Sequence, residues 1–121
     1  MAELNKNLMK ETVLIKSARE YFSSAEDETK KERYNAAVIL YFKALVALID
    51  LFILQTKGVT PSSHTERFRI AKENFPQVYD LLDKDFPFYQ DSYIQTMNKE
   101  AGEVIKDDII IMAEKTKTDL Q

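Results

Sequence analysis

The chain has 121 residues, 45% of them hydrophobic and 31% charged, which is the balance of one folded globular domain rather than of a disordered segment. It has no Cys and a single His, which excludes disulfides, thiolate zinc sites and any site built from several histidines. A formal net charge of −3 provides no global basic field that would attract nucleic acid.

The first predicted helix covers residues 4–25, where apolar side chains recur at helical spacing. Residues 26–33 follow as a charged stretch without apolar residues. Within this stretch Thr29 and Glu32 have the spacing of a capping box, in which each side chain satisfies an amide of the other residue. We therefore expect the second helix to begin there and to end at Lys57, with Gly58 in the left-handed conformation.

Residues 36–54 raise the question of a membrane span, because seventeen of these nineteen residues are apolar. Lys43 and Asp50 would both lie near the membrane centre, at a cost of about 2.5–3.5 kcal/mol each. The segment is therefore interpreted as a buried helix of a soluble protein. No apolar stretch follows a basic start at the N-terminus, so no secretory signal is expected, and the absence of Cys fits a cytoplasmic protein.

The same helix predicts self-association. Lys43 and Asp50 lie about 20° apart on the helical wheel and form one narrow polar seam on an otherwise apolar surface. Neighbouring helices in a chain this short cover most of that surface, and an uncovered apolar strip is a natural contact for a second copy. We expect a homodimer formed through this second helix.

The third predicted helix covers residues 64–74 and begins with another capping-box pair, Ser63 and Glu66. It ends before Pro76, because the residue before proline disfavours the helical region, and Pro76 can open a short fourth helix. Asp85, Phe86 and Pro87 are expected to break this fourth helix.

Apolar residues return at helical spacing over residues 86–97, so a further helical segment is expected there. The last predicted helix runs over residues 98–117, with a core stripe formed by Ala101, Val104, Ile105, Ile109 and Met112. A strand over residues 109–111 would have no partner strand. The pattern as a whole predicts a single all-α domain over residues 1–121.

One titratable cluster, at the start of the third helix, is a candidate phosphate site. A helix N-terminus offers free amides and the positive end of the helix dipole, which suits an anion. In this cluster Arg67 and Arg69 could hold a phosphate, Ser63 lies at the helix start, and His64 is expected to titrate near neutral pH. The alternative is structural, with Ser63 and Glu66 capping the helix and the basic residues forming a solvated face.

Other candidate chemistry is weaker. The carboxylate pairs Asp80/Asp83 and Glu100/Glu103 are interpreted as surface charge, because a lone His cannot complete a di-metal bundle site. The aromatic residues are interpreted chiefly as core, with base stacking as the alternative. No phosphate-binding glycine loop or hydrolase motif is present, and we expect no metal site and no cofactor.

Three segments together resemble the HEPN (higher eukaryotes and prokaryotes nucleotide-binding) domain family. They are residues 34–38 (YNAAV), residues 41–45 (YFKAL) and residues 57–64 (KGVTPSSH), followed by Tyr93 and a final amphipathic helix. The resemblance extends over about residues 5–117 and rests on loose motifs. It implies an up-and-down bundle of four to five helices and a homodimer. It also implies a possible nucleotidyltransferase partner, as in prokaryotic toxin–antitoxin pairs.

Many HEPN proteins are metal-independent ribonucleases with Arg, four to six residues and His near the penultimate or last helix. This sequence has neither Arg nor His after Arg69, so it resembles a member without that motif. The expected function is therefore non-catalytic, either binding a nucleotide or partnering a nucleotidyltransferase. One alternative is a ribonuclease with His64 as general base and Arg67 or Lys57 for the phosphate. The other is a helical protein-interaction module without a small ligand.

Overall fold

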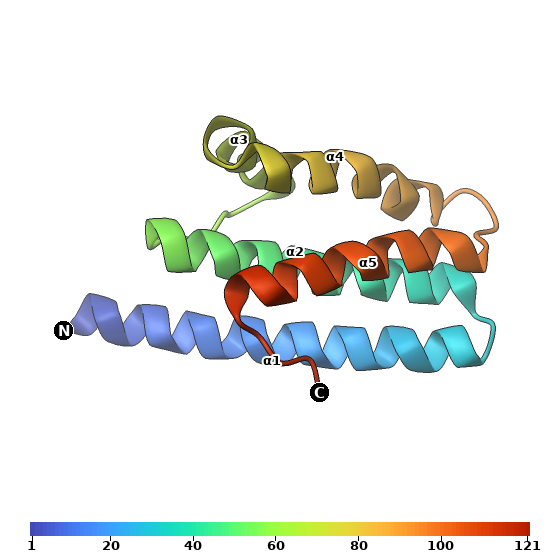
Figure 1. Cartoon of the computed structure of the whole chain (residues 1–121), viewed down its shortest axis with the longest axis horizontal. Coiled ribbons are helices and arrows are strands. Elements are labelled where there is room, and N and C mark those ends of the chain that lie inside the picture. The colour runs from blue at the N-terminus through green and yellow to red at the C-terminus, as the bar shows by residue number, and fades with distance from the viewer.

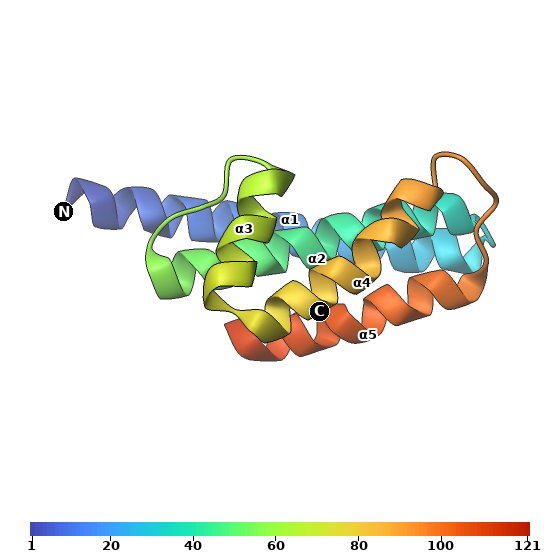
Figure 2. The same cartoon turned by 90° about the horizontal axis from the view of Figure 1, so that it is seen from above.

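The computed structural model describes residues 1–121 as five α-helices without strands. These are α1 (Ala2–Lys30), α2 (Tyr34–Lys57), α3 (His64–Asn74), α4 (Pro76–Asp91) and α5 (Lys99–Thr116). The helices α1, α2, α4 and α5 alternate in direction, while the short α3 crosses the bundle (Figures 1 and 2). The prediction of an all-α bundle is confirmed.

Helix α2 forms the centre of the bundle: α1 and α4 lie on opposite sides of it in Figure 1, and α5 packs along a third side (Figures 1 and 2). Of its 24 residues, 13 are buried, and the hydrophobic core of 22 buried residues draws on all five helices. Helix α2 is also the one helix long and apolar enough to cross a membrane, and 72% of its most apolar stretch is buried within the bundle. Helix α2 is apolar around most of its circumference because neighbouring helices cover it on most sides.

The predicted boundary between the first two helices is wrong. Helix α1 continues to Lys30, and Thr29 does not cap a new helix, because its hydroxyl donates to the Ala25 carbonyl at 2.9 Å within α1. The turn is completed by Glu32 at φ 59°, and Arg33 precedes α2 without a side-chain cap. The Thr29 hydroxyl also lies 3.3 Å from the hydroxyl of the buried Tyr41 in α2. Because the two residues are far apart in the sequence, the residues around Thr29 do not predict this contact.

The predicted break at Asp85, Phe86 and Pro87 is also wrong, since α4 runs through Pro87 to Asp91. Aromatic contacts on both sides of Pro87 link this part of α4 to α2. The Phe42 ring lies 5.8 Å from the Phe86 ring and 4.7 Å from the Tyr89 ring. This packing outweighs the hydrogen bond that proline cannot donate.

The further helical segment predicted over residues 86–97 is also wrong, because residues 86–91 belong to α4 and residues 92–98 lie outside the helices. The ends at Gly58, Ser63, Pro76 and Asn98 agree with the predictions. Gly58 ends α2 in the left-handed conformation at φ 76°, and the Ser63 hydroxyl accepts from the Glu66 amide at the start of α3. Pro76 opens α4, and the Asn98 side chain caps α5. These ends depend on neighbouring residues in the sequence, which is why the pattern predicts them.

Candidate functional site

The candidate site begins at the loop that connects α2 to α3. Gly58 turns the chain back over α2, and Ser63 then starts α3 with extended backbone and a hydroxyl cap on the Glu66 amide at 3.1 Å. The Ser62 hydroxyl donates to the Glu66 carboxylate at 3.1 Å and reinforces the same turn. These contacts set the direction in which the first turn of α3 presents its side chains to α2.

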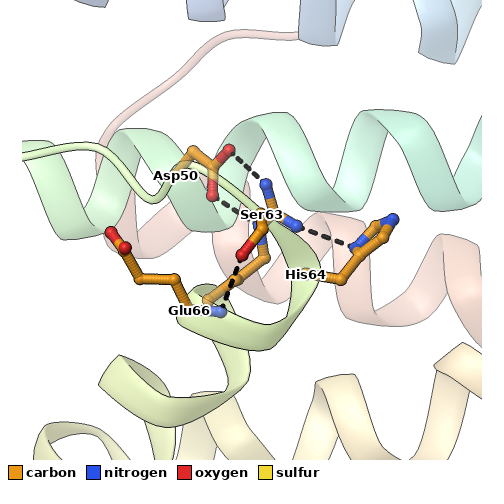
Figure 3. Close-up of polar contacts among 5 residues, drawn as sticks. Asp50, Ser63, His64 and Glu66 are labelled. Atoms are coloured by element: carbon orange, nitrogen blue, oxygen red, sulfur yellow. Dashed lines mark hydrogen bonds and ion pairs between the residues drawn. The ribbon is translucent and has the colours of Figure 1, made fainter.

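Arg67, one turn into α3, forms a two-pronged ion pair with Asp50 of α2 (Figure 3). Its Nε donates to Oδ1 at 2.7 Å and its Nη2 donates to Oδ2 at 2.9 Å. Both residues are buried, at 7% and 8% exposure. Burial raises the pKa of the Asp50 carboxyl, while the hydrogen bonds and charge of Arg67 oppose that rise. The pair therefore fixes α3 on α2 through a matched, water-poor charge contact.

His64 is held by the same guanidinium. The Arg67 Nη1 lies 2.8 Å from His64 Nδ1, and because Arg is always a donor, Nδ1 is the acceptor and the neutral ring carries its proton on Nε2. Partial burial and then the Arg67 charge lower the pKa of His64 below its ordinary value. At pH 7 the imidazole is therefore neutral and presents an N–H donor on the side away from Arg67.

Aromatic rings from α2 and α4 surround one side of His64. The His64 ring centroid lies 5.4 Å from that of Phe86, 6.2 Å from that of Tyr89 and 6.3 Å from that of Phe42. Tyr93 donates its hydroxyl proton to the Tyr89 hydroxyl at 3.1 Å, and this hydrogen bond, followed by burial, raises the pKa of Tyr89. These contacts limit the rotation of the His64 and Tyr89 rings.

Beside these rings lies a hollow of about 250 Å³, which we call the aromatic groove. Helices α1, α2, α3 and α4 all contribute to it, and α2 supplies five of its ten lining residues. Lys43 of α2 is exposed there and forms no ion pair with any carboxylate of the chain. The lining residues are Leu14, Ser17, Tyr21, Phe42, Lys43, Val46, Ala47, Asp50, His64 and Tyr89.

The four residues predicted to bind a phosphate do not converge. His64 and Arg67 lie together, but Ser63 is occupied as the helix cap. Arg69 lies two residues after Arg67, which places it about 200° away around the axis of α3. It is therefore exposed, and it pairs with Glu73 at 3.1 Å. A phosphate at this helix start remains a prediction, and it would require Arg67 to share its guanidinium between Asp50 and the ligand.

Sequence reasoning missed Asp50 as the partner of Arg67 and Lys43 as part of the groove. The signal was present in the polar seam that these two residues form on the apolar helix. The sequence pattern does not give the position of α3. That position places Arg67 and His64 against the seam formed by Lys43 and Asp50. Tyr89 was interpreted as core, with base stacking as the alternative, and its place in the groove depends on α4 continuing through Pro87.

The remaining candidate residues lie apart from the groove. Asp80, Asp83, Glu100 and Glu103 are exposed, which confirms their interpretation as surface charge. Lys57 is exposed at the end of α2. No group of three or more His, Asp or Glu side chains converges in the structure. The comparisons with protein-family models, curated proteins and solved structures find no match to this chain.

Proposed function

We propose that this chain is a non-catalytic, HEPN-like binding domain that holds a nucleotide in the aromatic groove. The observation that carries the proposal is the unpaired Lys43 ammonium in the same hollow as Tyr21, His64 and Tyr89. A planar base stacks on aromatic rings, and an ammonium attracts a phosphate. The groove thus combines the two chemistries that a nucleotide requires.

The dimensions and polar groups of the groove support a small ligand. A volume of about 250 Å³ lies slightly below the usual range for small-molecule sites, and the open side allows part of the ligand to remain in solvent. The Nε2–H of His64 and the Ser17 hydroxyl are further hydrogen-bonding groups at the lining. The Asp50–Arg67 pair positions His64 rather than contacting the phosphate itself.

A ribonuclease is the second candidate chemistry, and the geometry favours it less. General acid–base cleavage needs groups that exchange protons near neutral pH. His64 has one ring nitrogen occupied by Arg67 and a lowered pKa, and Lys43 carries the only unpaired side-chain charge in the groove. The resemblance to HEPN domains extends the proposal to a homodimer and to a nucleotidyltransferase partner of the toxin–antitoxin type.

The test is a thermal-shift and calorimetry panel of nucleoside mono-, di- and triphosphates and short RNA. A ligand at about 100 times its Kd adds about 2.7 kcal/mol of stability, or several degrees in Tm for a domain of this size. We expect such a shift for the unaltered protein and its loss in Lys43→Gln. Lys31→Gln, which alters an exposed lysine in the α1–α2 turn, is the matched control and keeps the shift.

Two outcomes contradict the proposal. The first is a panel without any shift for the folded protein, or a shift that Lys43→Gln retains. The second is RNA cleavage that His64→Ala abolishes, which would make the chain a ribonuclease instead.

A further inference from the structure

The first half of α1 presents a basic, apolar face that the bundle does not use, which we call the α1 face. It consists of Lys6, Met9, Lys10, Val13 and Lys16, which fall within about 120° of arc on the helix. All five are exposed, and Met9 and Val13 are 70% and 62% exposed. The N-terminal end of α1 extends beyond the other helices (Figures 1 and 2), so both sides of this end are accessible.

The α1 face borders a groove of its own. A hollow of about 410 Å³ lies between α1 and the α2–α3 loop and is distinct from the aromatic groove, with which it shares only Leu14 and Asp50. Its lining residues are Met9, Lys10, Val13, Leu14, Asp50, Thr60 and Pro61. Most of its exposed lining is apolar, and the half-buried Thr60 and Pro61 form the wall opposite α1.

The charge of the α1 face is opposite to that of the whole protein. Three lysines lie on it, whereas the chain carries a net charge of −3. Glu11, the acidic residue between Lys6 and Lys16, lies on the opposite side of α1, where its carboxylate accepts from Gln55. None of the three lysines forms an ion pair with a carboxylate of this chain. The face therefore offers three unpaired cations around two exposed apolar side chains.

We propose that the α1 face binds an acidic amphipathic helix of a protein partner. The spacing of Lys6, Met9, Lys10 and Val13 (i, i+3, i+4, i+7) is the one through which one helix packs along another. The apolar stripe of the partner covers Met9 and Val13 against Pro61, and its flanking carboxylates pair with the lysines. Charge complementarity selects this occupant and accelerates its association with the face.

The same charges disfavour the other occupants of this face. A second copy of the chain would bring the three lysines against three identical lysines. A membrane surface would attract the lysines, but an interfacial helix needs one dominant apolar face. In α1 the exposed apolar residues are divided, since Leu4 and Leu8 lie on the side opposite Met9 and Val13.

The experiment measures fluorescence anisotropy of two synthetic amphipathic peptides of about 20 residues with the same Leu stripe, one flanked by Glu and one by Lys. We expect the Glu peptide to bind at least about tenfold more tightly than the Lys peptide, and to weaken as salt is raised. Met9→Glu/Val13→Glu should reduce its affinity by about tenfold or more. Ile110→Glu, an exposed apolar residue of α5, is the control and leaves binding unchanged.

The proposal is overturned if the Glu peptide fails to bind or if both peptides bind equally. It is also overturned if the Met9→Glu/Val13→Glu protein, shown to be helical by circular dichroism, binds the Glu peptide as tightly as the unaltered protein. A parallel sedimentation assay uses vesicles of phosphatidylcholine with phosphatidylserine. Vesicle binding that Met9→Glu/Val13→Glu abolishes, without peptide binding, would assign the face to a membrane surface. Lys43→Gln should leave peptide binding intact, so this inference and the proposed nucleotide site can fail separately.

Discussion

Two buried carboxylates show how differently the same residue type behaves in this molecule. Asp50 lies against the Arg67 guanidinium, with both oxygens bonded. Asp85 of α4 is fully buried, and neither of its oxygens has a hydrogen-bond donor from the chain. Its neighbour is Asp108 of α5, which pairs with Lys84 at 2.9 Å. Asp50 therefore remains paired as an anion, whereas Asp85 is stable in the fold only when it holds a proton.

We expect Asp50→Asn to lower the free energy of unfolding by about 3 kcal/mol, because it leaves the buried Arg67 charge without its partner. Chemical denaturation measures this loss, which corresponds to a fall of roughly 10 °C in Tm. Arg69→Gln removes an exposed pair and should change stability by less than about 0.5 kcal/mol. A loss in Asp50→Asn as small as this control would show that the Asp50–Arg67 pair does not hold α3 in place.

The pH dependence of stability tests Asp85. Burial, followed by the neighbouring Asp108 carboxyl, raises the pKa of Asp85 to about 9. Between its ordinary pKa near 4 and about 9, the folded state holds a proton that the unfolded state lacks, so the free energy of unfolding falls as pH rises. We expect Asp85→Asn, whose amide can donate to Asp108, to be more stable than the unaltered chain at pH 8. Denaturant unfolding at pH 6 and pH 8 checks this difference.

The expected gain from Asp85→Asn increases with pH by up to about 1.4 kcal/mol per unit. A gain that is the same at both pH values would mean that Asp85 is already ionised in the folded protein. Asp83→Asn, at an exposed position of the same helix, is the control and should leave the pH dependence unchanged.

At the scale of the elements, the connection between α4 and α5 is held by one side chain of α2. The Asn35 amide donates to the carbonyls of Ser92 and Gln95, both at 2.8 Å, and its oxygen accepts from the Met97 amide at 2.9 Å. The segment between α4 and α5 contains no regular helix, so these bonds replace the ones that a helix would supply. Asn35 thereby holds Ser92, the residue that follows α4, against α2.

We expect Asn35→Ala to destabilise the protein by about 2 kcal/mol, because three backbone groups lose their partner. Amide hydrogen exchange should accelerate first at Met97, while the centre of α2 remains protected. Asn5→Ala, at an exposed position of α1, is the control. Uniform acceleration across all helices would instead indicate that Asn35 contributes to global stability without a local role.

At the scale of the whole molecule, the predicted homodimer depends on how much apolar surface α2 leaves uncovered. Its neighbours bury most of it, and the strip that contains Lys43 stays open, with the half-buried Ile39 and Val46 one turn to either side of Lys43. None of the exposed large apolar residues lies in α2; they are found on α1, in the loops that follow α2 and α4, and within α5. A dimer through α2 remains a prediction. The strip available for it shares Lys43 and Val46 with the aromatic groove, so a dimer contact there and a bound nucleotide would compete for these two residues.

Light scattering coupled to size exclusion tests the dimer directly. We expect a mass of about twice 14.1 kDa that falls toward 14.1 kDa on dilution. Ile39→Glu should give the lower mass at all concentrations, because it places a charge in the strip. Ile110→Glu, on α5, should not change the mass. A monomer at every concentration would contradict the prediction.

The sequence by itself determined the all-α class, the central position of the second helix and four of the helix ends, because periodicity and capping are properties of residues a few positions apart. Tertiary structure decided the rest. The contact between Tyr41 of α2 and Thr29 accompanies the continuation of α1 to Lys30. The Phe42 ring packs on Phe86 and Tyr89, on either side of Pro87 in α4. The position of α3 placed Arg67, a predicted phosphate ligand, against Asp50. Such contacts join residues far apart in the chain, and their energies exceed the local preferences of about 1–3 kcal/mol that a pattern records.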